Sequence, residues 1–355
     1  MTMEAHVLSR YAEGARRVEA DLCCPVSYDA QLLELLPREI VERDYGCGDP
    51  SRYVRSGDVV LDLGSGGGKI CYLAAVLTGA AGRVIGVDMN DEMLALARRH
   101  QPEMAAKLGG DRVCFRKGRI QDLAEDLEGV ADYLAAHPVV DGASLAAFEL
   151  ERARRRREEP MIPDGSVDLV LSNCVLNLVD DGEKPRLVRE IFRVLRPGGR
   201  AAISDIVSDG PIPERLKRDP ELWSGCLSGA FVEHEFLRAF REAGFVGATL
   251  DKWDDAPWRV VEGIEFRSAT LTAVKPLAFD GRAERGHWVI YRGPMAWVED
   301  EFGGRYAAGE RTPVSAEVFA RLSREPYAGM FILIHPGRPK SQIQVAGCVP
   351  GGGCC

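Results

Sequence analysis

The sequence contains no run of about 18 apolar residues, the length that a helix needs to cross a bilayer, so we expect no membrane-spanning segment. Its first 17 residues also lack the continuous apolar stretch of a secretory signal peptide. Basic residues are not in excess, because 45 Lys and Arg stand against 54 Asp and Glu, which gives a net charge of −9. We therefore predict a cytoplasmic protein whose partners include neither a membrane nor a nucleic acid.

One short stretch is strongly basic, but acidic residues balance it. Arg152 to Arg157 holds five arginines in six residues, and glutamates flank it on both sides. This pattern is more typical of a solvated charged helix than of a nucleic-acid site.

The sequence also has no C-x-x-C pair, the spacing that structural zinc sites commonly use. A disulfide framework is not expected in a reducing compartment, so the cysteines should bind a metal, take part in catalysis or fill the core. Cys71 and Cys114, inside a predicted helix and a predicted strand, are assigned to the core. The ten cysteines are Cys23, Cys24, Cys47, Cys71, Cys114, Cys174, Cys226, Cys348, Cys354 and Cys355.

The most informative stretch begins at Val59. Val59–Leu63 is an apolar run typical of a buried parallel strand; Gly64, Gly66 and Gly68 follow at alternate positions, and a helical pattern begins at Lys69. Glycines let the backbone approach a ligand closely because they lack a Cβ atom. A strand, a glycine turn and a helix in this order form the nucleotide-binding start of a doubly wound sheet.

A second strand, Arg83–Asp88, ends in an acid about 24 residues after Gly64, the distance at which an acid reaches a ribose hydroxyl. These features alone are compatible with NAD or with S-adenosylmethionine. However, Leu61–Gly66 (Leu-Asp-Leu-Gly-Ser-Gly) resembles the first motif of S-adenosylmethionine methyltransferases, and Val194–Gly199 resembles another of their common motifs. The resemblance predicts S-adenosylmethionine as the cofactor. The residues that we expect to bind it are Asp62, Gly64, Ser65, Gly66, Asp88, Met89, Ile120, Gln121 and Asn173.

Strand and helix patterns alternate through the middle of the chain, which predicts an α/β fold: a doubly wound, seven-stranded class I methyltransferase sheet. The expected later strands are 112–116, 166–174, 200–205, 246–254 and 266–275, and the expected helices are 91–100, 184–195 and 233–243. The residues after the third strand usually meet the adenine in such enzymes, which explains the choice of Ile120 and Gln121. Residues 123–163 are longer than a usual connection and are interpreted as an insertion.

The ends of the chain have a different character. The first 50 residues predict a helical leader, with helices at 1–22 and 31–43, that covers the mouth of the cofactor site. From about residue 280, strands at 287–292 and 330–334 and a helix at 315–324 predict a small α+β domain, arranged like a β-α-β unit. The expected organisation is a leader at 1–50, a methyltransferase domain at 51–275, a small domain at 276–340 and a flexible cysteine-rich tail at 341–355.

Three cysteines are predicted to meet at the mouth of the cofactor site. Cys47 lies in a glycine loop, Cys174 follows the fourth strand, and Cys226 lies between glycines. Each of them alone is more simply a small buried residue. Together, three separated thiols suit a three-coordinate, pyramidal soft ion, and trivalent arsenic fits best. Its lone pair could attack the methyl carbon of the cofactor with little need for a general base, since positioning would supply much of the rate.

Several motifs together resemble the arsenite methyltransferase family. They are Tyr45-Gly46-Cys47-Gly48, Gly86-Val87-Asp88-Met89, Ser172–Val179, Leu222–Ala230, Phe266–Thr270 and Val289–Tyr291. The resemblance implies that Cys174 and Cys226 hold arsenic throughout and that Cys47 is the third ligand. It also implies that Cys23 or Cys24 is an auxiliary thiol, which captures arsenic or pairs with Cys47. Glutathione or thioredoxin would supply electrons, arsenite would arrive as a thiol conjugate, and the products would be methylated arsenicals.

Two other hypotheses remain at this stage. The acceptor could be another thiophilic element, such as selenium, or a small organic molecule. This hypothesis predicts that no thiol triad is needed. The protein could instead bind a metalloid without catalysis, but the intact turn Gly64–Gly68 with Asp88 argues against that.

Overall fold

The structure is a computed structural model that describes residues 2–19, 26–277 and 286–335. Its contacts divide the chain into two compact units, Met1–Leu277 and Ala278–Cys355, which are described separately. Cys23, Cys24 and the predicted tail at 341–355 lie outside the described residues. Within the part of the chain that is described, no helix is both long enough and apolar enough to cross a membrane. The predicted four-part organisation stays a prediction.

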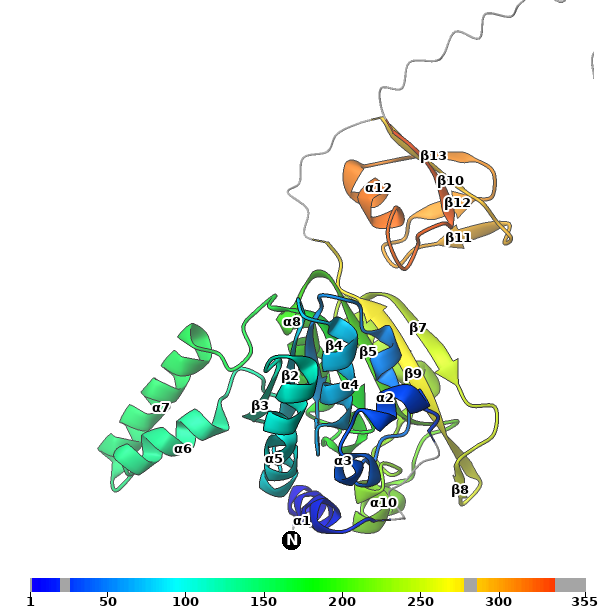
Figure 1. The fold of residues 1–355 in the computed structure, drawn as a ribbon. Helices are drawn as coiled ribbons and strands as arrows, with labels where there is room; N and C mark the ends of the chain where they lie inside the picture. Colours follow the sequence, from blue (N-terminus) through cyan, green and yellow to red (C-terminus); the bar gives the residue numbers. More distant parts are fainter. Residues whose placement is uncertain (1, 20–25, 278–285, 336–355) are drawn as a thin grey trace, which may run out of the picture. The chain divides into compact units, whose positions relative to one another are not determined.

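The first unit is built on one sheet, whose main path has the strand order β3-β2-β1-β4-β5-β9-β7 (Figure 1). β1 pairs in parallel with β2 and β4, whereas β9 runs antiparallel to β5 and β7. The order reverses between β1 and β4, and ligands bind at such a switch point, outside the carboxyl ends of the strands. The strands are β1 Val59–Leu63, β2 Arg83–Asp88, β3 Val113–Lys117, β4 Val167–Asn173, β5 Leu195–Ser208, β7 Val246–Trp253 and β9 Ile264–Val274.

This topology confirms the predicted seven-stranded class I methyltransferase sheet. Two short strands were not predicted: β6 (Phe231–Val232) pairs with β5, and β8 (Arg259–Val261) pairs with β9. β5 begins five residues before the predicted start at Arg200, because Leu195 pairs with Val167 of β4.

Helices cover both faces of the sheet. On one face, Ile40, Leu73 and Leu94 join one buried apolar cluster; on the other face, Ile191 and Phe240 belong to a second. Because both faces are covered, apolar residues predominate in β1 and β4 on both sides of the sheet, as in other parallel sheets. The helices are α3 Arg38–Glu42, α4 Lys69–Thr78 and α5 Asp91–Leu108 on the first face, and α8 Lys184–Val194 and α11 Glu233–Glu242 on the second.

The leader differs from its prediction at both helices: the helix expected at 1–22 ends at Arg16, where the backbone of Arg17 is extended, and the second is divided. The expected helix at 31–43 is two short helices, α2 (Ala30–Glu34) and α3, because Pro37 has no N–H group to continue the first and instead precedes the second. The first helix is α1 (Met3–Arg16), which packs against α5 and α10. The remaining short helices of this unit are η2 Pro50–Tyr53, η3 Leu176–Leu178, α9 Glu214–Lys217 and α10 Pro220–Ser224.

The 123–163 insertion forms a helical hairpin, α6 (Leu127–Ala136) and α7 (Gly142–Glu158), which extends away from the sheet beyond β3 (Figure 1). Neither helix contains a buried residue. At the base of the hairpin, Met161 N donates to Ala124 O at 3.2 Å and Ile162 N donates to Leu123 O at 2.9 Å. The two ends of the insertion therefore lie side by side.

The second unit is richer in strands than predicted. The expected strands and helix are present as β10 (His287–Tyr291), β14 (Phe331–Ile334) and α12 (Ala316–Leu322). The β-α-β arrangement is wrong, however, because β10 and β14 are antiparallel. The strands that the sequence did not reveal are β11 Trp297–Glu299, β12 Arg305–Ala307 and β13 Arg311–Val314. They are three or four residues long, too short to establish a clear alternation of apolar and polar residues.

Candidate active site

A cavity of about 770 Å³ lies at the carboxyl ends of β1, β2 and β4. Its size is typical of a site for a small molecule or cofactor. All of the residues predicted to bind the cofactor line it, and residues of α1, among them Leu8 and Tyr11, line it as well. Of the three predicted arsenic ligands, Cys174 lines this cavity.

The glycine turn after β1 has the backbone geometry that only glycine adopts easily. Gly64 and Gly66 have φ of 69° and 50°. A Cβ atom added at Gly64 would lie 2.4 Å from Cγ1 of Val175, whereas one at Gly66 would approach only Met93 Sδ, at 4.0 Å. Between them, the buried hydroxyl of Ser65 has no hydrogen-bond partner. The turn thus leaves room for a ligand at Gly66 and offers it the Ser65 hydroxyl, which fits S-adenosylmethionine.

Asp88 stabilises this turn from the end of β2. Its carboxylate accepts hydrogen bonds from Gly66 N and Asn90 N, both at 2.8 Å. Burial raises the pKa of Asp88, and these backbone donors offset part of that rise. The same acid that we predict to meet the cofactor therefore also fixes the glycine turn.

Asp62, near the end of β1, is a second buried acid on the cavity wall. Burial raises its pKa to about 7, opposed in part by a hydrogen bond from Cys71. Cys71 Sγ donates to Asp62 Oδ2 at 3.2 Å. Cys71 is fully buried inside α4, and Cys114 is partly buried in β3, where the sequence analysis placed them.

Replacing Asp62 with asparagine should flatten the pH dependence of stability. The pKa of Asp62 is raised from 3.8 to about 7 on folding, so its contribution to stability is fully present below pH 3.8 and is lost as the pH rises through 7. From about pH 5.5 to about pH 8, the wild type should lose about 2 kcal/mol relative to Asp62→Asn. Urea unfolding at both pH values measures this difference, and equal losses in the two proteins would contradict it.

Asn173, the last residue of β4, has a role that the sequence did not reveal. Its Oδ1 accepts hydrogen bonds from Cys47 N and Gly48 N, both at 3.0 Å. Its Nδ2 donates to Gly48 O at 2.8 Å and to the Tyr28 hydroxyl at 3.1 Å. All four hydrogen bonds of the carboxamide are thus used. Asn173 lines the cofactor cavity, but its side chain fixes the loop that carries Cys47.

Close packing leaves this loop little freedom. A Cβ atom at Gly46 would lie 2.0 Å from Nδ2 of Asn173, and one at Gly48 would lie 2.6 Å from Cβ of Ser204. Ser268 Oγ donates to Cys47 O at 2.6 Å. The two glycines that flank Cys47 are therefore needed so that the loop can lie directly on the ends of β4 and β5.

Cys174 and Cys226 share an unusual backbone conformation. Their φ angles are 63° and 62°, in the left-handed region that residues other than glycine rarely adopt. Such strain persists only where the surrounding structure enforces it, and it is concentrated at functional sites. Cys226 Sγ donates to Cys174 O at 3.1 Å, so the two residues are in direct contact.

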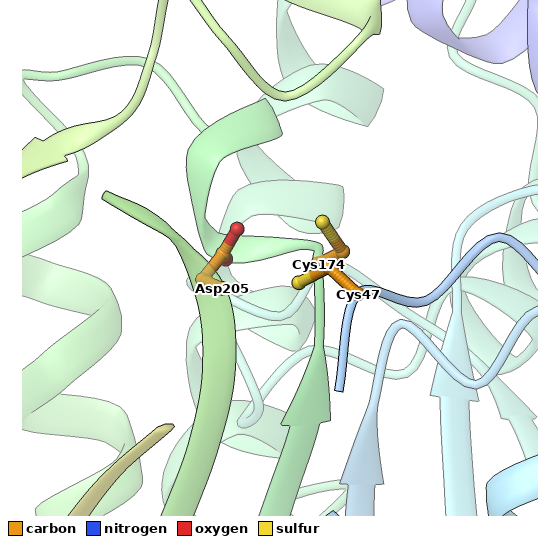
Figure 2. Close-up of side chains that lie close together, drawn as sticks. All are labelled: Cys47, Cys174 and Asp205. Carbon is orange, nitrogen blue, oxygen red and sulfur yellow. The ribbon is translucent and has the colours of Figure 1, made fainter. Parts of the chain in front are cut away.

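Cys47, Cys174 and Cys226 belong to one buried cluster and are at most 4% exposed. The sulfur atoms of Cys47 and Cys174 and a carboxylate oxygen of Asp205 all lie within 4.8 Å of one another (Figure 2). Cys226 is not one of these three residues. It contacts Cys174 through the hydrogen bond from Cys226 Sγ to the backbone oxygen of Cys174. The structure thus brings the three predicted ligands together, and it adds an acid.

Sequence reasoning missed Asp205. It lies near the carboxyl end of β5 and is fully buried, and its carboxylate accepts a hydrogen bond from Ile206 N at 2.9 Å. Burial raises its pKa to about 7, and backbone donors and Lys184 limit the rise. An acid inside the apolar strand Ala201–Val207 was the available signal, because charged residues are almost never buried without a role or a partner.

Tyr11 of α1 was also missed. Its hydroxyl lies 3.9 Å from Cys226 Sγ. Burial, and secondarily Cys226 and Cys174, raise the pKa of Tyr11 well above its usual value. The phenol therefore stays protonated and can donate to a thiolate. Nothing in the helical pattern of the leader distinguishes Tyr11 from a core aromatic residue.

Comparisons with known proteins show the family to which the chain belongs. A family model described as a methyltransferase domain matches residues 54–244. An arsenite methyltransferase from Aquipseudomonas alcaligenes is 32% identical over an alignment of 335 residues, which covers 89% of this chain and 86% of that protein. The chain belongs to the arsenite methyltransferase family. It is accordingly an enzyme that uses S-adenosylmethionine as methyl donor, as predicted.

Other members of the arsenite methyltransferase family are similar over most of the chain. The Mus musculus protein is 30% identical, with 86% of this chain and 74% of that protein covered. The crystal structure of an arsenic(III) S-adenosylmethionine methyltransferase from Chlamydomonas reinhardtii matches with a TM-score of 0.57 and 26% identity, covering 87% of this chain and 96% of the other. A second family model, a domain of unknown function, matches residues 280–351.

Proposed function

We propose that this enzyme methylates trivalent arsenic held by the thiolates of Cys47, Cys174 and Cys226, and so detoxifies arsenic as methylated arsenicals. The observation that carries the proposal is the meeting of these three residues in one buried cluster, with Cys174 on the wall of the cofactor cavity. Thiolates are the ligands that soft ions prefer. The names of the relatives point to the same substrate.

The arrangement suits capture of arsenite by exchange of ligands. Each thiol that binds gives up a proton as an arsenic–oxygen bond breaks, and one water leaves per arsenic–sulfur bond that forms. Asp205 and Tyr11 are the polar side chains beside the thiols that can accept or donate protons there. When bound, S-adenosylmethionine would supply a methyl group on a positively charged sulfur; the arsenic lone pair would form the bond to that carbon while the carbon–sulfur bond breaks and its electron pair returns to sulfur.

A thiol reductant completes the proposal. Transfer of a methyl cation leaves arsenic oxidised by two electrons, so two thiols must be oxidised to a disulfide to return it to the trivalent state. Glutathione or thioredoxin would supply these thiols and could deliver arsenite as a thiol conjugate. Cys71, Cys114 and Cys226 are free thiols. The cytoplasmic location stays a prediction. The role of Cys23 or Cys24 as auxiliary thiol stays a prediction.

The experiment is a methyl-transfer assay with labelled S-adenosylmethionine and glutathione, in which the acceptor is varied. We expect label to enter the product with arsenite and not without it. Transfer to selenite, with arsenite inactive, would move the proposal to another thiophilic element. Transfer to small organic acceptors that survives alkylation of the cysteines would contradict any role for the thiols.

A further inference from the structure

The loop that follows β3 links the cofactor cavity to the insertion. Ile120 and Gln121 line the cavity, and Asp122 comes directly after them. The Asp122 side chain is 8% exposed. Whatever holds this carboxylate therefore also fixes the two residues that are predicted to meet the cofactor.

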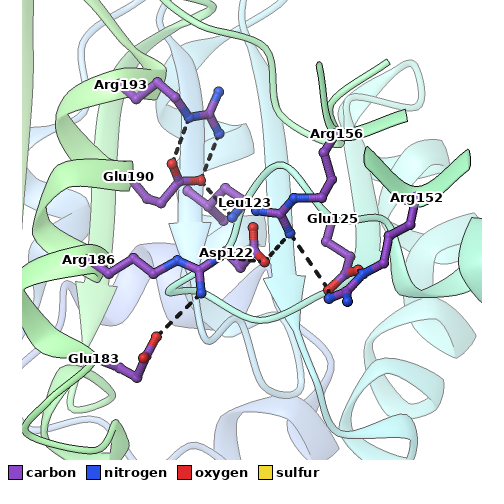
Figure 3. A network of polar contacts seen from close by, with 9 residues as sticks. All are labelled: Asp122, Leu123, Glu125, Arg152, Arg156, Glu183, Arg186, Glu190 and Arg193. Atoms are coloured by element: carbon purple, nitrogen blue, oxygen red, sulfur yellow. Dashed lines mark hydrogen bonds and ion pairs between the residues drawn. The ribbon is translucent and has the colours of Figure 1, made fainter. Parts of the chain in front are cut away.

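Two arginines from different elements hold Asp122 (Figure 3). Arg156 of α7, in the insertion, pairs with Asp122 Oδ2. Arg186 of α8, in the body of the fold, pairs with the same oxygen at 2.7 Å. A charge pair at a mostly buried carboxylate contributes more than one on the open surface, because solvent screens it less.

The segment that continues from this loop is held on both sides as well. Leu123 N donates to Glu190 Oε2 of α8 at 2.8 Å. On the hairpin side, Glu125 Oε2 accepts a hydrogen bond from Arg152 Nη2 at 2.9 Å. Arg156 Nη1 lies 3.9 Å from the same oxygen. Figure 3 shows these pairs on either side of the same loop.

The hairpin makes these contacts without burying any of its own residues. Charge pairs, rather than an apolar core, therefore join it to the fold: Arg152 and Arg156 of α7 pair with the loop, and Glu128 of α6 pairs with Arg98 of α5 at 2.8 Å. The arginine run Arg152–Arg157, which the sequence analysis assigned to a solvated helix, therefore contacts the loop after β3 through Arg152 and Arg156.

We propose that the insertion is a positioning element for cofactor binding, and that Arg156 is its positioning residue. Arg156 holds Asp122 so that Ile120 and Gln121 keep their places on the cavity wall. Without this contact the loop must be ordered when the cofactor binds, which weakens binding. The inference concerns the methyl donor alone, so it stands or falls independently of the arsenic acceptor.

The test compares Arg156→Ala with Arg157→Ala. Arg157 is the matched control, because it is the next residue of the same helix, is 73% exposed and pairs with the adjacent Glu158. We expect Arg156→Ala to weaken the binding of S-adenosylhomocysteine, measured by calorimetry, by roughly tenfold. The KM for S-adenosylmethionine should rise by the same factor at unchanged kcat. Arg157→Ala should match the wild type.

Three further measurements separate positioning from a general loss of stability. Arg156→Lys keeps the charge and should recover part of the affinity, and added salt should weaken binding to the wild type more than to Arg156→Ala. Replacing residues 126–159 by a short glycine-serine linker is sterically feasible, because the ends of the insertion are already paired, and it should weaken binding at least as much as Arg156→Ala. Equal affinities for Arg156→Ala, Arg157→Ala and the wild type would overturn the proposal, as would unchanged affinity in the deletion.

Discussion

Conversion of Cys174 to serine should abolish arsenite-dependent methyl transfer. Serine keeps the size of the side chain but removes the soft sulfur ligand, so arsenic would be held by two thiolates and would no longer be fixed beside the cofactor. We expect the rate to fall by roughly 1,000-fold or more, equivalent to about 4 kcal/mol of transition-state stabilisation. Cys226→Ser should behave alike. Label transfer from S-adenosylmethionine to arsenite measures both rates.

The control for these variants is Cys114→Ser. Cys114 is a free cysteine in β3 that lies apart from the buried cluster of Cys47, Cys174 and Cys226, so its replacement should leave the rate within about twofold of the wild type. Binding of S-adenosylhomocysteine should be retained in all three variants. Arsenite methylation at the wild-type rate in Cys174→Ser would eliminate the thiolate mechanism.

Replacing Asn173 with alanine should cause the second-largest loss. The change removes four hydrogen bonds and leaves buried groups of the Cys47 loop without partners. We expect the free energy of unfolding to fall by about 3 kcal/mol and kcat to fall by roughly 100-fold, because Cys47 is no longer held in place. Chemical unfolding and the arsenite assay measure the two effects.

A milder change at the same network supplies the comparison. Tyr28→Phe removes one of the four hydrogen bonds of Asn173 and the bond that the Tyr28 hydroxyl donates to Gly48 O, so it should cost about 1–2 kcal/mol and leave most of the activity. If Asn173→Ala instead raised the KM for S-adenosylmethionine alone, with Cys47 still binding arsenite, Asn173 would act mainly on the cofactor, as the sequence analysis first assigned it.

The fold could be predicted in its main features because its signals are local. Apolar strands such as Val59–Leu63, the turn beginning at Gly64 and the amphipathic helix Lys184–Val194 each identify themselves within a few residues. The break at Pro37 could also have been read, since proline restricts the residue before it. The short strands β11 to β13 could not, because three or four residues are too few to show a clear alternation of apolar and polar residues.

The candidate site was partly predictable for the same reason. Cys47, Cys174 and Cys226 stand in distinctive motifs, and the topology of a doubly wound sheet brings strand ends together. The hydrogen bond between Asn173 and Cys47 joins residues that are 126 positions apart in the sequence, and the pair of Arg156 and Asp122 joins residues 34 positions apart. Such contacts follow from tertiary packing, so no local pattern indicates them.

The left-handed backbone at Cys174 and Cys226 has a consequence for engineering this enzyme. Glycine would relieve about 1 kcal/mol of backbone strain at either position, but it would leave a cavity in place of the buried thiol. A redesign guided by backbone geometry alone would therefore favour glycine at these two positions and erase the thiols. Any screen for a more robust enzyme must score metalloid turnover together with melting temperature, or it will select a well-folded protein that has lost its substrate.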